Sequence, residues 1–253
     1  MTNGLLLREK ARDLVKSGLD WISISLDGTK ETNDYLRGIK GDYERVMEGV
    51  NQIKKYNPQL PINIGTTIVD QNISQIPQLI KIASKLGATW SFNLFDNHLY
   101  FFKGVKENFF LIKNKKIVDR IIDYLYFCRK KFSSMFRYDN TSLEFARNYL
   151  KQKKISFHCI LGLFRVYIDS KFNVYSGCWV LPPVGNLKES ELKEILESKR
   201  YKERIREMFY LKCPGCTCGY VGNLMIENLP LTLIHFISNR KFFLNFLKKF
   251  KNS

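Results

Sequence analysis

The sequence contains no run of 18 apolar residues, and this absence excludes a conventional transmembrane helix. We also expect no secretory signal, because residues 1–20 carry Arg8, Glu9, Lys10, Arg12 and Asp13 on an amphipathic pattern. We therefore expect a reducing, cytoplasmic environment, in which structural disulfides are rare.

Acidic residues are few relative to basic ones. The chain has 24 Asp and Glu against 41 Lys and Arg, which gives a formal charge of +17. Such an excess is typical of proteins that bind nucleic acid or anionic membranes. Lysine is nevertheless spread over the whole chain together with abundant Asn and Ile, a pattern that AT-rich codon usage also produces. We therefore expect no specific nucleic-acid partner.

Cysteine is scarce, but five of the six cysteines fall between residues 159 and 218. In the turn from Cys213 to Cys216, Gly215 lets the backbone curl so that two thiolates can reach one metal. Thiolates suit zinc or an iron–sulfur cluster, and the sequence leaves this choice open. The predicted ligands are Cys159, Cys178, Cys213 and either Cys216 or Cys218, with His158 as a less favoured substitute.

Two alternatives for these cysteines are less favoured. The reducing environment argues against disulfides, and three cysteines within residues 213–218 argue against plain buried thiols. Cys128, by contrast, lies on the apolar stripe of a predicted helix, so we expect it to be a core thiol.

The first half of the sequence alternates apolar runs with amphipathic helices, which is typical of βαβ units and a parallel sheet. Parallel strands present their carboxyl ends at one edge, where the chemistry of such sheets is found. The patterns predict strands over 21–26, 62–68 and 89–95, and helices over 5–17, 42–56 and from about Pro77 onward.

The second half contains helices, a hairpin and a basic end. His98 lies in an irregular aromatic stretch, and we expect it to be structural because nothing pairs it with a nucleophile. Residues 240–251 predict a basic amphipathic helix, and both peripheral contact with an anionic membrane and docking on its own domain fit this pattern. Helices are expected over 116–132, 142–153, 190–198 and 199–208, and hairpin strands over 164–168 and 173–175.

Short motifs follow one another in a fixed order between residue 2 and about residue 220. They are Thr2-Asn-Gly4, Ser25-Leu-Asp-Gly28, Arg37-Gly38, Gly41-Asp-Tyr43 and Val184-Gly-Asn-Leu187. In this order they resemble the third strand, the fourth strand with its following segment, and the linker of the radical S-adenosylmethionine (radical SAM) enzymes that carry a C-terminal SPASM or twitch domain.

The resemblance implies an α/β fold in three parts. These are a partial (β/α)6 barrel over residues 1–135, a small α+β SPASM-like domain over 136–223 that includes a linker helix, and the basic tail over 224–253. It also implies two cofactors, S-adenosylmethionine across the carboxyl ends of the strands and an auxiliary 4Fe-4S cluster on the cysteines.

By position, the resemblance places Ser25, Asp27 and Arg37 at the ribose and carboxylate of S-adenosylmethionine and Asn93 near its adenosyl part. These residue types fit, because a carboxylate accepts hydrogen bonds from ribose hydroxyls and a guanidinium binds a carboxylate with two donors. The alternative for Ser25 and Asp27 is an ordinary turn at the end of a strand.

Two motifs of the family are missing. The chain has neither a Cys-Xaa3-Cys-Xaa2-Cys motif nor a Gly-Gly-Glu-Pro segment. Since Thr2-Asn-Gly4 resembles the third strand, we expect the first two β/α units to be absent and this chain not to cleave S-adenosylmethionine. In a longer form, the resemblance implies an oxidoreductase or modifying enzyme whose 5′-deoxyadenosyl radical acts on a peptide or small-molecule substrate.

Two hypotheses from other classes stay open. The missing motif favours a non-catalytic fragment that binds an iron–sulfur cluster or zinc and acts as a binding module. The charge together with the Cys213–Cys216 turn favours a zinc-containing nucleic-acid binder, whose binding would depend steeply on salt.

Overall fold

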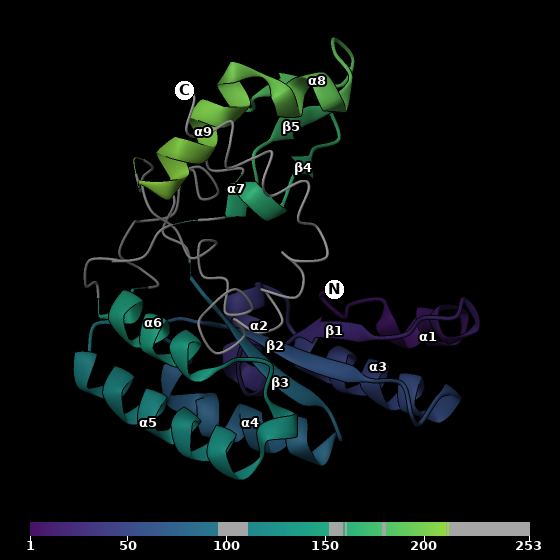
Figure 1. Cartoon of the computed structure of the whole chain (residues 1–253). Coiled ribbons are helices and arrows are strands. Elements are labelled where there is room, and N and C mark those ends of the chain that lie inside the picture. The colour runs from purple at the N-terminus through teal and green to yellow at the C-terminus, as the bar shows by residue number, and fades with distance from the viewer. Residues whose placement is uncertain (96–110, 152–158, 160, 179–180, 211, 213–253) are drawn as a thin grey trace.

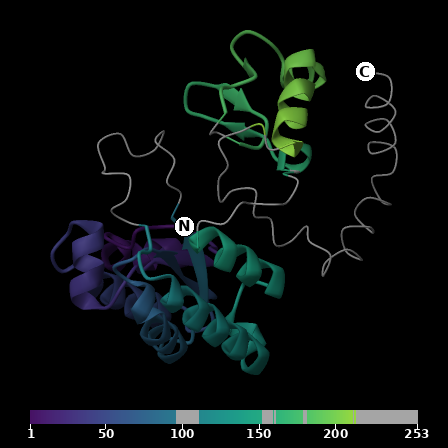
Figure 2. The same ribbon diagram turned by 90° about the vertical axis from the view of Figure 1, so that its left-hand side faces the viewer.

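A computed structural model describes residues 1–95, 111–151, 159, 161–178, 181–210 and 212, which form two bodies (Figure 1 and Figure 2). The first body contains α1 (Leu7–Lys16), β1 (Ile22–Ser25), α2 (Lys30–Arg37), α3 (Asp42–Tyr56), β2 (Ile62–Ile68), η1 (Ile73–Gln75), α4 (Ile76–Lys85), β3 (Thr89–Leu94), α5 (Lys115–Lys131), η2 (Ser133–Met135) and α6 (Asn140–Leu150). The second contains α7 (Leu161–Phe164), β4 (Tyr167–Ile168), β5 (Asn173–Tyr175), β6 (Gly185–Asn186), α8 (Leu192–Glu197) and α9 (Lys199–Phe209).

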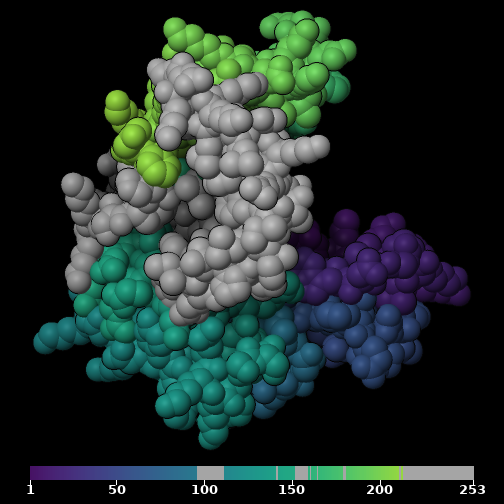
Figure 3. Space-filling view, viewed as in Figure 1, coloured from purple at the N-terminus to yellow at the C-terminus, as the bar shows by residue number. Residues whose placement is uncertain are grey.

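The first body is built on a parallel sheet in the order β1-β2-β3, which confirms the predicted βαβ pattern. Parallel pairing continues on both sides of these strands, because Thr2 bridges to Ile24 and Phe136 bridges to Trp90. In the space-filling view, α1 and α3 lie at one end of this body and α5 and α6 at the other (Figure 3).

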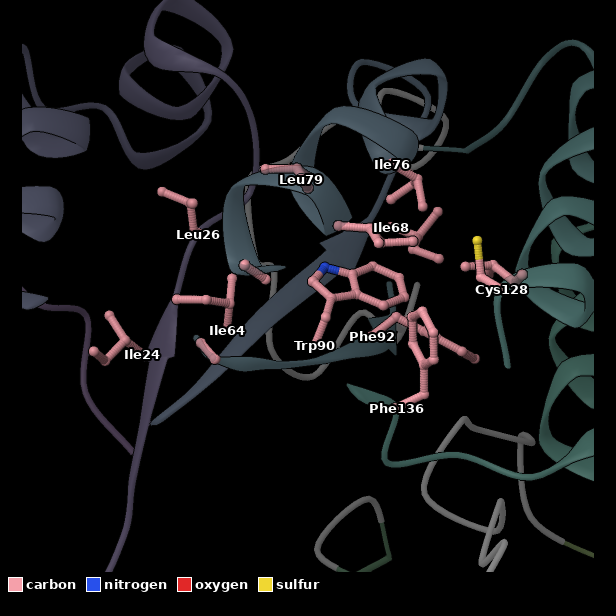
Figure 4. Close-up of a cluster of buried hydrophobic side chains, with 14 of the residues drawn as sticks. Ile24, Leu26, Ile64, Ile68, Ile76, Leu79, Trp90, Phe92, Cys128 and Phe136 are labelled. Carbon is pink, nitrogen blue, oxygen red and sulfur yellow. The ribbon is translucent and has the colours of Figure 1, made fainter. Parts of the chain in front are cut away.

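One face of the sheet is apolar and carries the core. The register sets Ile24, Ile64 and Trp90 side by side. Every second residue along each strand from these positions lies on the same face. Helices α3, α4 and α5 lie along this face (Figure 1). Figure 4 shows the strand residues meeting Ile76 and Leu79 of α4 and the side chain of Cys128. Cys128 is buried in this core, as predicted.

The other face of the sheet is polar, because side chains alternate along each strand. We call it the polar face. It consists of Ser23 and Ser25 of β1, Asn63, Gly65 and Thr67 of β2, and Thr89, Ser91 and Asn93 of β3. No residue on it is charged, although this chain has an excess of lysine and arginine.

The core of the first body extends past the boundary that we predicted at residue 135. Phe136 pairs with the sheet, and Leu143, Ala146 and Leu150 of α6 belong to the same buried cluster. The second body has a buried cluster of its own, formed by Val174, Val184, Ile195, Tyr201 and Ile205. None of the helices in the described ranges is long and apolar enough to span a membrane.

The hairpin is confirmed, with β4 paired to β5, although β4 covers only the end of the strand predicted over 164–168. Helices α8 and α9 lie close to their predicted bounds. Besides the single turns η1 and η2, three elements were not predicted: α2, α7 and β6, which pairs with β5. The last two are short, and β6 is defined by its antiparallel pairing with β5.

Candidate cofactor and metal sites

The carboxyl edge of the sheet brings together three of the four predicted cofactor residues. Ser25 ends β1, Asp27 follows two residues later, and Arg37 ends α2, where Gly38 with φ of 67° closes the helix. Asn93 lies on β3 opposite Thr67 of β2, and its side chain is exposed.

Asp27 is held from two sides. Its Oδ1 accepts a hydrogen bond from the backbone N–H of Thr67 at 2.7 Å, and its Oδ2 lies 2.7 Å from Nη2 of Arg37. The residue is 8% exposed. Burial raises the pKa of Asp27 above its ordinary value, and this effect outweighs the lowering by the Arg37 charge and the Thr67 hydrogen bond.

Arg37 keeps donors that Asp27 does not use. Nη2 lies against the Asp27 carboxylate, and the Nε of Arg37 is buried without any hydrogen-bond partner among the described residues. A buried donor without a partner destabilises a protein unless something accepts its hydrogen bond. The guanidinium is therefore fixed by Asp27 and still able to bind an acceptor.

Two buried amides that the sequence analysis missed fix the loops at this edge. Asn72 donates to the carbonyl oxygens of Asp27 and Thr67, both at 2.8 Å, and so ties the end of β1 to the end of β2. Asn33 accepts from the backbone N–H of Asp27 at 2.9 Å and donates to Asp42 at 2.8 Å. Asparagine is common in turns, and this was the signal that the sequence offered for both residues. It does not reveal their partners, most of which lie far away in the sequence.

Several polar side chains near this edge have no partner. Within the described ranges, the side chains of Ser25, Thr67 and Asn93 make no hydrogen bond. All three belong to the polar face. Ser25 is the last residue of β1, and Thr67 and Asn93 form the last-but-one pair of β2 and β3, so all three lie near the carboxyl edge. Together with Arg37, these side chains offer hydrogen-bond donors and acceptors that no described residue uses.

The predicted metal ligands are described only in part. Cys159 and Cys178 are buried in the second body. Cys213, Cys216, Cys218 and the substitute His158 lie outside the described residues, as does the predicted tail helix. No group of three or more His, Cys, Asp or Glu side chains within the described ranges is arranged to hold a metal.

The segments that carry Cys159 and Cys178 run against each other. A Cβ added to Gly177 would lie 2.7 Å from the carbonyl oxygen of Leu161, and φ of Gly177 is +75°. The end of α9 reaches the same place, because Sδ of Met208 lies 3.6 Å from Oγ of Ser176. From Met208 the sequence continues directly to Cys213.

A comparison with protein families matches the first part of the first body. Residues 1–83 match the model of the radical SAM superfamily. This range, about a third of the chain, is therefore similar to proteins of that superfamily. The matched range contains Ser25, Asp27, Arg37 and the whole of β1 and β2. The comparison does not reach the proposed SPASM-like domain, which stays a prediction, as does the absence of two β/α units.

Two curated relatives support the radical SAM assignment. The pre-heme d1 synthase of Dinoroseobacter shibae is 37% identical over 87 residues, which are 34% of this chain and 21% of that protein. The AdoMet-dependent heme synthase of Methanosarcina barkeri is 25% identical over 240 residues, which cover 87% of this chain and 65% of that protein. The chain thus spans less than two thirds of either relative.

A solved structure shares the fold. It is described as hexahistidine-tagged anSMEcpe with bound AdoMet, and it matches with a TM-score of 0.56 at 21% identity. The match covers 84% of this chain and 61% of that one. It supports the α/β fold of this chain.

Proposed function

We propose that this chain is a radical SAM protein of the oxidoreductase or modifying class that binds S-adenosylmethionine at the carboxyl edge of its sheet and an auxiliary iron–sulfur cluster at its cysteines. The observation that carries the proposal is Arg37, whose buried Nε has no partner among the described residues while Asp27 fixes its guanidinium. This pair lies inside the range that matches the superfamily.

The residues at this edge fit S-adenosylmethionine chemically. Its methionyl carboxylate is an acceptor for the spare donors of Arg37, and a planar guanidinium suits a carboxylate. Its ribose and base carry donors and acceptors that match the side chains of Ser25, Thr67 and Asn93, which make no hydrogen bond to any described residue. Asp27 is best described as the residue that positions Arg37, because both of its oxygens are engaged within the protein.

S-adenosylmethionine bound to a reduced cluster supplies radical chemistry to enzymes of this superfamily. The cysteines of these 253 residues do not form the motif that holds that cluster. For this chain, the proposal is therefore cofactor binding and auxiliary cluster binding, and cleavage is proposed only for a form in which the first cluster is present.

The auxiliary cluster is proposed on Cys159, Cys178, Cys213 and one of Cys216 and Cys218. The close passage of Gly177 against Leu161, together with the arrival of α9, supports a common site for these thiolates. Consecutive Cα atoms are about 3.8 Å apart, so Cys178 lies within reach of the segment after Cys159. Thiolate ligands suit both iron–sulfur clusters and zinc.

The substrate is proposed to be a small molecule, with a peptide as the second candidate. The relative that aligns over most of this chain is named a heme synthase, which favours a compound of the tetrapyrrole class. We also propose a cytoplasmic location, because thiolate sites of this kind persist in a reducing compartment. Membrane contact through residues 240–251 remains a separate prediction.

Anaerobic reconstitution with iron and sulfide tests the cluster. The expected result is a brown protein with about four iron and four sulfide per chain, the content of one cluster, lost in Cys178→Ser. Stoichiometric zinc in the isolated protein, with no cluster after reconstitution, would support the binding-module hypothesis instead.

Equilibrium binding of S-adenosylmethionine tests the cofactor site. Arg37→Lys keeps the charge beside Asp27 but loses the planar donors, so we expect about a tenfold lower affinity at unchanged stability. Arg8→Lys is the matched control, because Arg8 pairs with Glu48 on the exposed surface of the same body. Equal affinity in the wild type and Arg37→Lys would remove Arg37 from the site.

A further inference from the structure

The parallel sheet of the first body gives its main helices a common direction. Because β1, β2 and β3 run the same way, α1, α3 and α4 run back against them and end where the next strand begins. The end of α5 lies on the same side, since Phe136, five residues later, pairs with Trp90 near the start of β3. We call this side of the first body the amino end. It is opposite to the carboxyl edge that carries Asp27 and Arg37.

The amino end has an excess of positive charge. The last turns of these four helices and the segments that follow them, residues 13–21, 53–61, 82–88 and 128–139, contain eight basic residues and three acidic ones. A last-turn lysine is favoured by the helix dipole, which places roughly half a negative charge at each helix end. Four helix ends offset about two of the five surplus charges, so the amino end remains positive.

The exposed cations of the amino end have no acidic partner. They are Lys16, Lys55, Lys85, Lys130, Lys131 and Arg137. Within the described part of the chain, none of these side chains forms an ion pair or a hydrogen bond. By contrast, Arg8 and Lys30, in the first turns of α1 and α2, pair with Glu48 and Glu44. The cations of the amino end are therefore available to an anionic partner.

Large apolar side chains are exposed among these cations. Phe127 is 59% exposed, Phe132 is 51% exposed and Trp21 is 38% exposed. Nζ of Lys131 lies 6.0 Å from the centre of the Phe127 ring and 5.4 Å from that of Phe132, and Cζ of Arg137 lies 4.8 Å from the centre of the Trp21 ring. Phenylalanine has no polar group to keep in water, so folding gains nothing from exposing two of them together. Such a surface fits a partner that is both anionic and apolar.

We propose that the amino end binds the surface of an anionic lipid bilayer. The lysines and Arg137 bind lipid phosphates, while Phe127 and Phe132 enter the boundary between headgroups and acyl chains. Tryptophan is typical of this boundary, because its ring is apolar and its N–H is polar, and Trp21 fits there. The cytoplasmic leaflet supplies such a surface, because it carries anionic lipids.

Two features favour lipid over single-stranded nucleic acid. Each of the three rings already has a cation over it, whereas stacking of a base needs an open ring face. The cations come from the ends of four helices across one side of the body, whereas a strand of nucleic acid follows a groove. The proposal does not depend on the proposed function, and a bilayer at the amino end leaves the carboxyl edge open.

Cosedimentation of the full chain with vesicles tests the proposal. We expect binding to phosphatidylcholine vesicles that contain phosphatidylglycerol and none to phosphatidylcholine alone. Lys130→Gln/Lys131→Gln should lower the partition coefficient by about 25-fold, since each lysine near an anionic bilayer contributes about fivefold. Phe127→Gln/Phe132→Gln should lower it by about tenfold or more, because the rings no longer leave water. Both variants should unfold at the wild-type temperature, because the replaced side chains are exposed.

Matched controls replace the same residue types at the other end of the first body. Lys40 and Lys113 are exposed shortly before α3 and α5 begin, and Tyr35 of α2 is 62% exposed. Lys40→Gln/Lys113→Gln and Tyr35→Gln should change the partition coefficient by less than about twofold, because charges farther away than the Debye length are screened.

Three results would overturn the proposal. The first is a wild type that does not bind the anionic vesicles. The second is binding that neither double variant at the amino end weakens more than the controls do, which would place the contact elsewhere, for example at residues 240–251. The third is a wild type that binds a single-stranded oligonucleotide more tightly than the vesicles and loses this binding in Phe127→Gln/Phe132→Gln, which would make nucleic acid the partner of the amino end.

Discussion

Asp27 and Arg37 form an ion pair of 2.7 Å in which the Asp27 side chain is 12% exposed and the Arg37 side chain 25% exposed. The two residues belong to different elements, the loop after β1 and the last turn of α2. Because both are largely removed from water, neither charge is stable without the other. The pair therefore links the stability of the carboxyl edge to the geometry of the proposed cofactor site.

Removing the cation should destabilise the fold. Arg37→Met leaves the Asp27 carboxylate buried with only the Thr67 N–H as a donor, and we expect a loss of about 2 kcal/mol in the free energy of unfolding. Urea denaturation measures this value. The double variant Asp27→Asn/Arg37→Met should recover most of the loss, and Arg8→Met, at an exposed ion pair, should change little. A double variant as unstable as Arg37→Met would contradict the pairing.

Asp27 also predicts a pH dependence of stability. Burial raises its pKa above the ordinary 3.8, so the folded protein keeps this proton to a higher pH than the unfolded chain does. The contribution of Asp27 to stability therefore falls as the pH rises from 3.8 through the raised pKa, and is regained on acidification through that window.

The comparison with Asp27→Asn isolates this effect. The free energy of unfolding of wild type minus that of the variant should decrease with rising pH across the window. Asp34 has the opposite dependence, because the backbone N–H of Tyr43 lowers its pKa, but it is present in both proteins and cancels. A difference that increases with pH would show that Arg37, rather than burial, dominates the pKa of Asp27.

The second body contains a strained residue at the tip of its hairpin. Phe172 has φ of 67°, a left-handed conformation that costs a non-glycine residue roughly 1–2 kcal/mol. Phe172→Gly should therefore stabilise the protein by about 1 kcal/mol, measured by urea denaturation.

The aromatic ring of Phe172 partly offsets that gain. Nζ of Lys188 lies 5.4 Å from the centre of the ring, a cation–π contact that glycine removes. Lys188→Met measures this contribution separately. If Phe172→Gly were less stable than Lys188→Met, the strain at Phe172 would be smaller than its φ indicates.

Gly177 should be needed for the auxiliary cluster. Alanine there places a Cβ 2.7 Å from the carbonyl oxygen of Leu161 and requires a left-handed backbone, so the segment that carries Cys178 must move away from α7. We expect Gly177→Ala to lose most of its iron and sulfide after anaerobic reconstitution, measured per chain.

The control for Gly177 separates backbone strain from displacement. Gly87 has φ of +58° with nothing near an added Cβ, so Gly87→Ala carries comparable strain without a clash. It should keep the wild-type iron content. A Gly177→Ala protein that holds a full cluster would show that Cys178 does not depend on this close passage.

Local periodicity was enough to predict much of the fold. Helix α3 and strand β2 have the bounds read from the sequence, 42–56 and 62–68, because apolar spacing and turn residues act over a few positions. The cysteine pattern and the order of short motifs likewise indicated the superfamily. In β1 and β2, polar residues such as Ser23, Ser25 and Asn63 alternate with apolar ones. This alternation indicated the polar face, although our prediction did not use it.

Only the tertiary structure decided which of these residues are engaged and which are open. Asp27 is held by Arg37 and Thr67, whereas Ser25 has no side-chain partner within the described ranges. The bridge from Phe136 to Trp90 and the burial of Asn72 likewise depend on residues that are far away in the sequence. The physical reason is distance along the chain: periodicity records a residue's own helix or strand, while hydrogen bonds and free space depend on atoms about forty residues away, as at Asp27 and Thr67.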